Sequence, residues 1–436
     1  MDSWDSNVWQ NLPRRWGHSL HRMCSYLAMF PPALPRYIIE QFSNPGDTVL
    51  DPFSGRGTAP LEACLAGRIG VGLDLNPLAY VLTGAKVDPP LPGEIVHRLN
   101  TLEENYSHPD LNEVPDEIKM LFDGRGALPQ LVFLRNNLDI NNRIDRYILG
   151  TACGLLHGNA RQDGTSRYFS ISMPNTFSMS PAYVRRFIRS HNLKKNPIDV
   201  FDALRTRAVQ LLGKPSSHNV GQAKLGNARF ISRTTPEIAR KSPPRLIVTS
   251  PPYLNVVRYG KFNWIRLWLL RKSAAEADRK CGISVERTDR KLNLDDTHGD
   301  SKYSAFMESV LKGLSDVSAD DAVLALVIGD VEKRTGESIN LSNQVLQIAL
   351  EHTSLRHLTT IEDRLPDGEK VTRIWGAREG NATKTDRILI LYKGRRPTPR
   401  HSNPQSIIEE LAKTDSTPIE SNSSPRCDHS FGSWPR

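Results

Sequence analysis

The alternation of apolar and polar positions predicts an α/β core that begins near residue 32. Apolar residues recur at helical spacing over 32–42, and the turn residues Asn44-Pro45-Gly46-Asp47 end that helix. Thr48–Asp51 is a short apolar run that ends in an acid, as expected of a buried strand. A helix is predicted from Thr58 to a stop at Gly67, followed by a second strand over 69–75. This order of elements begins a doubly wound α/β domain.

The pattern changes between about 100 and 220, where amphipathic helical segments dominate without strand alternation. Strands return near 228–231, 245–250 and 323–331, and 387–392 is expected to be the last one. We therefore predict a core split in sequence around a largely helical insertion. The expected units are a core of 1–100 and 220–395, an insertion of 101–219, and a disordered tail of 396–436 that is rich in Pro, Ser and charge.

Composition narrows the class of protein. The 436 residues carry 57 Lys+Arg against 48 Asp+Glu, a formal charge of +9, and the pI near 9.3 hints at a polyanionic partner. No apolar run reaches the roughly 20 residues of a membrane span, and the N-terminus lacks an apolar signal segment. Five scattered cysteines without a CxxC pair argue against disulfides and structural zinc, and the histidines form no metal-spaced cluster. We expect a cytoplasmic protein with no membrane partner and no metal.

The first candidate site is the segment Asp51-Pro-Phe-Ser-Gly-Arg-Gly-Thr58. Its glycines allow a sharp turn after the strand, and the following helix presents free N–H groups to a ligand. Asp74, one βα unit later, is placed to accept hydrogen bonds from a ribose diol. The acid that ends the strand suits a ligand with a cationic amino-acid end. An ordinary tight turn is the alternative for this motif alone.

The second candidate site is Thr249-Ser250-Pro251-Pro252-Tyr253, directly after the strand at 245–250. The two prolines stiffen the turn and remove two N–H donors. Ser250 and the Pro251 carbonyl can accept hydrogen bonds from the exocyclic amine of a planar base, which would stack on Tyr253. A purely structural turn is the alternative, and it becomes less plausible when both motifs follow adjacent strands.

The chain resembles the exocyclic-amine DNA methyltransferases, whose cofactor is S-adenosylmethionine. Asp51–Thr58 is similar to the cofactor motif DPFxGxGT, Gly72–Pro77 to the ribose motif, and Ser250–Tyr253 to the catalytic SPPY. Two weaker likenesses are Tyr26–Pro31, which resembles the motif that covers the methionine end, and Gly226–Arg229, which resembles a turn near the adenine.

The resemblance implies a Rossmann-like methyltransferase fold, mostly parallel with an antiparallel last strand. It also implies the site residues. The expected catalytic residues are Ser250, Pro251, Pro252 and Tyr253, and the expected cofactor-binding residues are Tyr26, Phe30, Pro31, Asp51, Pro52, Phe53, Gly55, Gly57, Thr58, Asp74, Asn76, Asn227 and Ala228.

SPPY is typical of cytosine-N4 methyltransferases, whereas DPPY is more usual for adenine-N6, which stays open as the alternative product. Cytosine-C5 methylation needs a nucleophilic thiolate in a Pro-Cys pair, and no proline precedes a cysteine here. Methylation of RNA or protein amines and an inactive DNA-binding regulator are less favoured. The expected partner is double-stranded DNA, with the target base flipped out of the helix. The family also implies a restriction-modification system with a cognate endonuclease.

Basic residues outside the two motifs are candidates for DNA contact. We expect phosphate binding by Arg185, Arg186, Arg189, Lys194 and Lys195 of the insertion and by Arg258 and Lys261 after the catalytic turn. A merely solvated basic helix is the alternative in the insertion. Asn263 is expected to line the substrate entrance, and Trp264 and Trp268 to pack in the core. The charged run from Arg271 to Tyr303 is expected to be a mobile loop.

Overall fold

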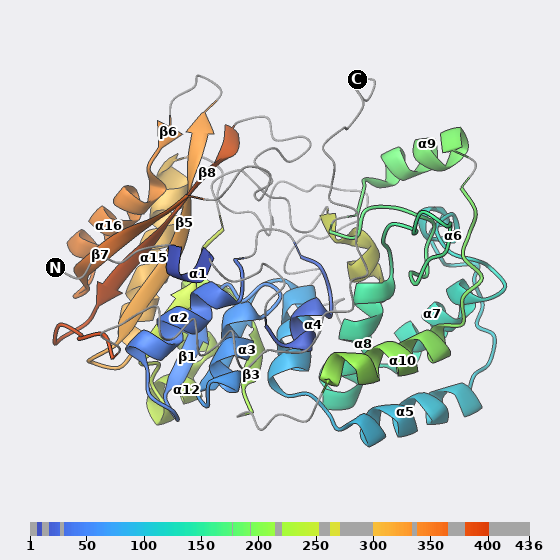
Figure 1. The fold of residues 1–436 in the computed structure, drawn as a ribbon, viewed down its shortest axis with the longest axis horizontal. Helices are drawn as coiled ribbons and strands as arrows, with labels where there is room; N and C mark the ends of the chain where they lie inside the picture. Colours follow the sequence, from blue (N-terminus) through green and yellow to red (C-terminus); the bar gives the residue numbers. More distant parts are fainter. Residues whose placement is uncertain are drawn as a thin grey trace.

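The computed structural model describes residues 7–10, 17–26, 30–176, 178–191, 193–213, 220–252, 262–270, 300–333, 338–364 and 380–400. A sheet lies between two layers of helices, and a helical lobe stands beside it (Figure 1). The strands are β1 (Thr48–Asp51), β2 (Ile69–Asp74), β3 (Gln222–Leu225), β4 (Leu246–Thr249), β5 (Val323–Lys333), β6 (Ser338–Ile339), β7 (Arg356–Arg364) and β8 (Gly380–Tyr392).

Within the described residues the strands form one sheet in the order β3-β2-β1-β4-β5-β8-β7, and β6 pairs with β5. The pairs from β3 to β5 are parallel, whereas β8 runs antiparallel to both of its neighbours. The predicted fold class, a doubly wound and mostly parallel sheet with an antiparallel last strand, is confirmed. The strand order reverses between β1 and β4, and ligands of such sheets bind outside the carboxyl ends at this point.

Helices cover both faces of the sheet because each face buries its own apolar cluster. One cluster joins Val49 and Val248 to helices α2 (Ala33–Phe42) and α3 (Thr58–Leu65), and α4 (Pro77–Val87) lies next to α3. The opposite cluster joins Leu50 and Ile247 to the helices α11 (Ile231–Thr234), α12 (Pro236–Lys241), α15 (Asp300–Val317) and α16 (Leu341–His352).

Glycines in β2 explain how closely the helices approach the sheet. A Cβ on Gly70 would lie 2.0 Å from the Pro60 carbonyl oxygen of α3, and one on Gly72 would lie 2.6 Å from Cγ2 of Thr83 in α4. Because side chains alternate along a strand, Val71 and Leu73 point to the other face, where they are buried. The sequence Gly-Val-Gly-Leu therefore places two helices directly against the strand that ends in Asp74.

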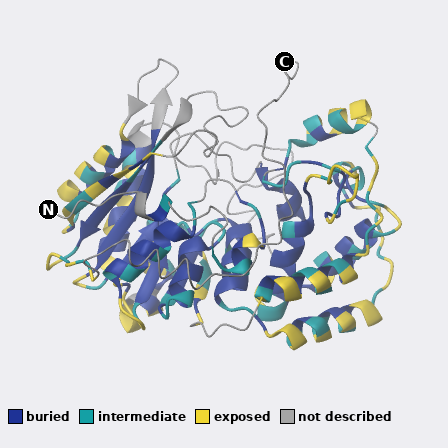
Figure 2. Cartoon of the chain, viewed as in Figure 1, coloured by how far each residue is buried: buried dark blue, intermediate teal, exposed yellow. Residues whose placement is uncertain are grey.

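The insertion forms the helical lobe and shares its core with the sheet domain. Leu78 and Leu82 of α4 belong to the same buried cluster as Ile148 of the insertion and Trp264 and Trp268. In Figure 2 the inner helices of the lobe are buried, and the outer faces are exposed. The helices of the lobe are α5 (Pro92–Glu104), α6 (Asp116–Lys119), α7 (Ala127–Asn137), α8 (Arg143–Leu155), α9 (Pro181–His191) and α10 (Val200–Leu212), and the chain also forms α1 (Asn7–Gln10), η1 (Ser19–Arg22) and η2 (Ala228–Phe230).

Two predictions of local structure are wrong. The segment 228–231 is not a strand but the helical turn η2 followed by the first residue of α11, because the side chain of Asn227 accepts a hydrogen bond from the Arg229 N–H (3.0 Å) and caps the turn. The strand at this edge is β3, six residues earlier. The end of the expected loop, 300–303, belongs to α15, where Tyr303 is buried.

The C-terminal tail lies almost entirely outside the described residues. Its described part ends at Arg400, whose backbone N–H donates to the Gln41 carbonyl oxygen and whose guanidinium donates to that of Ser43.

Candidate functional site

The two motifs meet because their strands are neighbours. β1 pairs with β4 in parallel, with Val49 opposite Leu246 and Leu50 opposite Ile247, so that both chains leave the sheet at the same edge. The Thr249 hydroxyl donates to a carboxylate oxygen of Asp51 at 2.5 Å. Ser250 follows Thr249 directly, and the Ser-Pro-Pro turn that we predicted to be catalytic therefore begins beside the acid that opens the glycine loop.

The glycine loop is closed against the end of β2. Gly55 and Gly57 adopt left-handed backbone conformations with φ of +50° and +77°, which side-chain-bearing residues rarely adopt. The carboxylate of Asp74 accepts from the N–H groups of Gly55 and Asn76, both at 2.9 Å. Asp74 is thus fixed at the mouth of the loop.

The remaining residues of the motif stabilise this turn. Pro52 is buried, and the Phe53 N–H donates to the Asp51 carboxylate at 3.1 Å. The Phe53 ring lies on Phe306 of α15, with ring centroids 5.8 Å apart. Thr58 begins α3 and is buried.

Distant segments complete the surroundings of the loop. The Asn76 side chain caps α4 by accepting from the Leu78 N–H, and its amide donates to the hydroxyl of buried Tyr26 at 3.1 Å. A Cβ on Gly55 would lie 3.4 Å from the Tyr26 ring. Phe30 and Pro31 are half-buried just before α2, whereas 27–29 lie outside the described residues.

On the other side, the turn with Asn227 and buried Ala228 is joined to β2, because the Gly226 N–H donates to the Asp74 carbonyl oxygen (2.9 Å). Each described residue expected to bind the cofactor therefore lies on or beside the carboxyl edge of β1, β2, β3 or the entry to α2.

Burial raises the pKa of both carboxyl groups of the site, so that each ionises less readily than in water. Loss of water raises the pKa of Asp51 to about 7, although hydrogen bonds from Thr249 and Phe53 oppose the shift. Burial also raises the pKa of Asp74 to about 6, against the hydrogen bonds from Asn76 and Gly55. Within the described residues neither carboxylate takes part in an ion pair, and a cationic ligand would restore their charge.

Two basic side chains, buried Lys86 and half-buried Arg56, stabilise the glycine loop, and sequence reasoning did not single them out. Lys86 is fully buried in α4, and its ammonium donates to the Arg56 carbonyl oxygen at 2.6 Å. Arg56 in turn donates to the His21 carbonyl oxygen at 3.1 Å. Burial lowers the pKa of Lys86 well below its ordinary value and that of Arg56 to about 10. A single lysine within the apolar helix 77–87 was the available signal.

The catalytic turn is described as far as Pro252. The Ser250 hydroxyl donates to the Val327 carbonyl oxygen of β5 at 2.9 Å. Pro251 is buried and Pro252 half-buried, while Tyr253, Arg258 and Lys261 lie outside the described residues.

Beyond this gap the prediction for Asn263 is wrong and that for the tryptophans is confirmed. Asn263 does not line an entrance, because it is buried and its side chain accepts from Arg266 at 2.9 Å. Trp264 and Trp268 are core residues with 4% exposure each.

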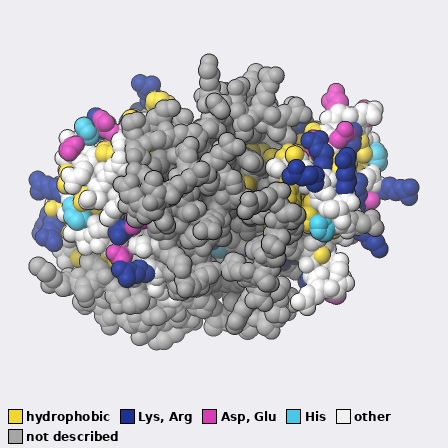
Figure 3. Space-filling view, turned by 90° about the horizontal axis from the view of Figure 1, so that it is seen from above, with side chains coloured by type: hydrophobic (Ala, Val, Ile, Leu, Met, Phe, Trp, Pro, Cys, Tyr) yellow, Lys and Arg dark blue, Asp and Glu magenta, His cyan; other side chains and the backbone are white. Residues whose placement is uncertain are grey.

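The basic candidates of the insertion gather on and after α9. Arg185, Arg186 and Arg189 are exposed on the helix, and Lys194 and Lys195 are exposed just beyond its end. Figure 1 shows α9 on the side of the molecule toward which β5 points. Seen from that side in Figure 3, Lys and Arg side chains crowd the outer lobe, next to the undescribed region.

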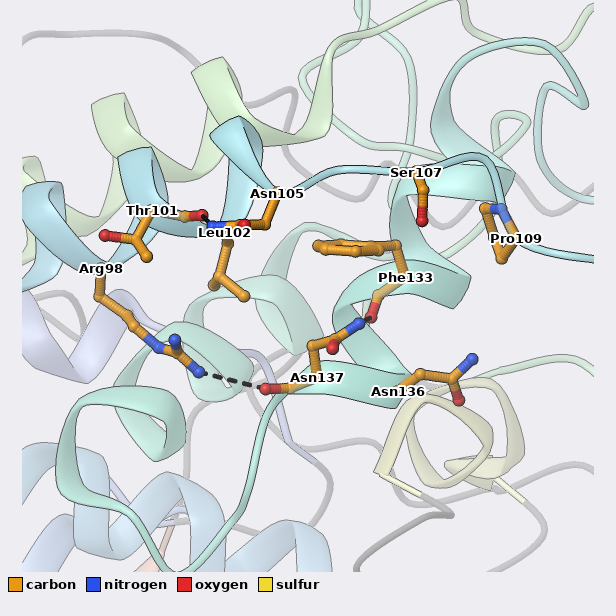
Figure 4. A pocket seen from close by; sticks show the side chains of 9 residues that line it. All are labelled: Arg98, Thr101, Leu102, Asn105, Ser107, Pro109, Phe133, Asn136 and Asn137. Atoms are coloured by element: carbon orange, nitrogen blue, oxygen red, sulfur yellow. Dashed lines mark hydrogen bonds between the residues drawn. The ribbon is translucent and has the colours of Figure 1, made fainter.

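A cavity of about 510 Å³ lies elsewhere, between α5 and α7 (Figure 4). The basic residue of its lining, Arg98, donates hydrogen bonds to the Asp145 carboxylate at 2.8 Å and to the Asn137 carbonyl oxygen. None of the predicted site residues lines it. The lining residues are Arg98, Thr101, Leu102, Asn105, Ser107, Pro109, Phe133, Asn136 and Asn137.

Two further kinds of feature are absent from the described residues. No group of three or more His, Cys, Asp or Glu there is arranged to hold a metal ion. Of the helices in the same residues, none is both long and apolar enough to cross a bilayer.

Part of the chain is similar to known methyltransferases. Residues 1–82 match a family model described as DNA methylase. Type II methyltransferase M.BsoBI of Geobacillus stearothermophilus is 29% identical over 118 residues, which are 26% of this chain and 22% of that protein. Type II methyltransferase M.MjaI of Methanocaldococcus jannaschii is 36% identical over 75 residues, which are 17% of this chain and 24% of that protein. The matches thus span less than a quarter of the length of these relatives.

Among solved structures, the rRNA methyltransferase aviRa of Streptomyces viridochromogenes aligns over 94% of this chain and 96% of its own, with 11% identity and a TM-score of 0.31. Residues 1–82 are thus similar to DNA methylases, and parts of the chain are similar to Type II methyltransferases. These similarities do not distinguish cytosine N4 from adenine N6 as the methylated atom.

Proposed function

We propose that the chain is an S-adenosylmethionine-dependent DNA methyltransferase that methylates the N4 amine of a flipped cytosine. Methylation of adenine N6 is the alternative. The observation that carries the proposal is the hydrogen bond between Thr249 and Asp51, which joins the start of the catalytic turn to the glycine loop. A methyl donor bound at one motif would then lie next to an amine bound at the other.

The described residues fit S-adenosylmethionine. Asp51 and Asp74 are buried or half-buried carboxyls with raised pKa values, and a cation nearby would favour their ionised forms. The left-handed backbone of Gly55 and Gly57 shapes the loop, and the Asp74 carboxylate keeps acceptor capacity for a ribose hydroxyl beyond its bonds from Gly55 and Asn76. When bound, the cofactor supplies a methyl group on a sulfonium centre.

Ser250 is proposed to act as a hydrogen-bond acceptor. Its hydroxyl proton is already donated to the Val327 carbonyl oxygen, so its oxygen offers lone pairs to an incoming N–H group. Pro251 and Pro252 have no N–H groups that could compete, and the Pro251 carbonyl is a second acceptor. Two such bonds favour a tetrahedral amine nitrogen, which is more nucleophilic than a planar one. Tyr253 would hold the base by stacking.

No side chain is assigned as a general base. The amine becomes acidic as it gains the methyl group, and its proton leaves to solvent. The remaining contribution of the chain is alignment of amine and donor, which can supply several orders of magnitude in rate. Since the amine of a stacked base cannot reach the turn, the target base must flip out of the duplex.

The proposed partners are double-stranded DNA and, through the Type II relationship, a cognate restriction endonuclease, in the cytoplasm. The test incubates the full chain with plasmid DNA and labelled S-adenosylmethionine and identifies the modified nucleoside by mass spectrometry. N4-methylcytosine is expected. N6-methyladenine would support the alternative, and label in RNA or protein but not in DNA would contradict the proposal.

A further inference from the structure

The segment 164–198 has a single sign of charge. Its 35 residues contain six Lys or Arg and no Asp or Glu, and α9 lies in its centre. Such a charge distribution attracts a polyanion. The cations are Arg167, Arg185, Arg186, Arg189, Lys194 and Lys195.

Helix α9 presents most of its surface outward. Val184 is its fully buried residue, with Ile188 packed partly against the same cluster. Tyr183, Phe187 and His191 stack along one side, with ring centroids 5.8 Å and 4.3 Å apart. This column of rings, one turn apart, stiffens a helix that has few other contacts.

The arginines of α9 differ in whether a carboxylate pairs with them. Arg185 is paired with the Glu117 carboxylate of α6 at 2.7 Å. Arg186 and Arg189 are exposed, and within the described residues neither has a hydrogen-bond or ion-pair partner. Three residues apart, they project from one face of the helix about 4.5 Å apart along its axis. Stacked base pairs are about 3.4 Å apart along the DNA axis. The spacing of the two side chains is therefore close to that of neighbouring base pairs.

A seam of hydrogen bonds sets the place of α9 relative to the catalytic turn. The seam joins 175–179, directly before α9, to 262–268, which follow the turn in the chain. The Ser178 N–H donates to the Phe262 carbonyl oxygen (2.6 Å) and the Trp264 indole to that of Met179 (2.7 Å). Fully buried Arg266 donates to the Asn175 carbonyl oxygen at 2.6 Å. Because Trp264 and Trp268 pack in one cluster with Leu61 of α3, the seam also ties the start of α9 to the sheet domain.

We propose that α9 lies in the major groove of the DNA, and that Arg186 and Arg189 read neighbouring guanines of the recognition sequence. This inference rests on the proposed function. A guanidinium can donate two hydrogen bonds to O6 and N7 of guanine, a contact worth about 5- to 150-fold in discrimination at one position. Lys194 and Lys195, past the end of the helix, bind phosphates and carry no sequence information.

The test compares methylation motifs. The full chain and its variants methylate a plasmid library of random sequence, and sequencing that detects the modified base reports the preferred context. R186A and R189A are each expected to lose the preference for guanine at one position. R186K, which keeps the charge without the two-pronged donor, is expected to behave like R186A.

Two control variants separate reading from charge. K194A is expected to weaken DNA binding equally for all sequences and to reduce the dependence of affinity on salt by about one ion. R240A removes an exposed arginine of α12, near the start of β4 and thus at the opposite edge of the sheet, and is expected to change nothing.

The outcomes distinguish this inference from the proposed function. A wild type that methylates no DNA contradicts the proposed function. A wild-type motif that persists in R186A and R189A overturns the assignment of α9 alone. A uniform loss of activity without a change of motif would make both arginines phosphate contacts and would also overturn it.

Discussion

At the scale of single residues, the site is governed by the cost of burying a charge. A carboxylate that loses its water must be compensated by donors or by a cation. Asp51 has two donors, Thr249 and Phe53, and its pKa still rises to about 7. The buried position of Asp51 therefore lowers the stability of the folded protein at neutral pH. Such a cost is expected of a residue whose role is to bind a ligand.

Asp51→Asn is expected to stabilise the protein in a pH-dependent manner. The folded-state pKa of about 7 exceeds the ordinary 3.8, so wild-type stability falls as pH rises from about 4 to 7 and is then constant. The asparagine does not titrate and keeps an acceptor for Thr249. Unfolding midpoints measured from pH 4.5 to 8.5 should show a gain that grows to at most about 4 kcal/mol above pH 7. A gain that is independent of pH would contradict the raised pKa.

Ser250→Ala is expected to lower kcat by about 100-fold or more, because the amine loses an acceptor that acts as the methyl group is transferred. Cofactor affinity, measured by calorimetry, should stay within about two-fold, since Ser250 lies outside the glycine loop. Ser309→Ala, which removes a hydroxyl bonded only within α15, serves as the control. Full activity of the Ser250 variant would eliminate its proposed role.

At the scale of elements, the glycine loop depends on close packing as well as on backbone conformation. Gly57 has a φ of +77°, and a Cβ there would lie 2.8 Å from the Thr83 Cα of α4. Gly46 has a φ of +86° but no atom within 4 Å of the added Cβ. An alanine at either position would therefore adopt a strained left-handed backbone. Only the alanine at position 57 would also collide with α4.

Gly46→Ala is expected to cost about 1 kcal/mol, and Gly57→Ala at least about 2 kcal/mol more together with weakened cofactor binding. Denaturant unfolding measures the first quantity, and calorimetry with S-adenosylmethionine measures the second. Equal costs at the two positions would mean that α3 and α4 can move apart, contrary to the packing observed.

The seam between the insertion and the segment after the catalytic turn depends on Arg266. The guanidinium is fully buried and also donates to the Cys153 carbonyl oxygen at 3.2 Å. Arg266→Met should lower the free energy of unfolding by about 2–4 kcal/mol, because buried acceptors lose their donor. Arg240→Met, in an exposed position, is the matched control. A loss no larger than that of the control would show that water replaces the guanidinium.

At the scale of the whole molecule, the lobe and the sheet share a core. The cluster that holds Tyr147 and Phe169 of the insertion also holds Leu61 of α3 and Leu78 of α4. The boundary expected at residue 100 lies inside α5, which packs against α8 and α10. The insertion is therefore joined to α3 and α4, which follow the glycine loop and β2.

We expect a single unfolding transition for the chain. Because the lobe and α4 share one apolar cluster, neither part can unfold without exposing the core of the other. Far-ultraviolet circular dichroism follows all helices, and tryptophan fluorescence includes Trp264 and Trp268 in the shared cluster. The two urea midpoints should coincide. Separate midpoints would show that the insertion is an independent domain.

The sequence predicted strands where a short, continuous apolar run marks a buried one. The runs at 48–51, 69–74 and 246–249 are strands as expected, since they are apolar and end in turn residues. It missed β7, an edge strand of largely exposed and polar side chains whose pattern differs little from that of a loop. It placed a strand at 228–231 because apolar spacing does not reveal a capped turn.

By itself the sequence determined the buried strands β1, β2 and β4, the glycine loop and the proline turn, because these follow from local preferences of backbone and side chains. The proximity of Thr249 and Asp51 was decided by tertiary structure, since the pairing of β1 with β4 joins segments nearly 200 residues apart. The burial that raises the pKa of Asp51, the support from Lys86 and the place of α9 were decided there as well. Desolvation and long-range contact are properties of packing, and a linear pattern does not encode them.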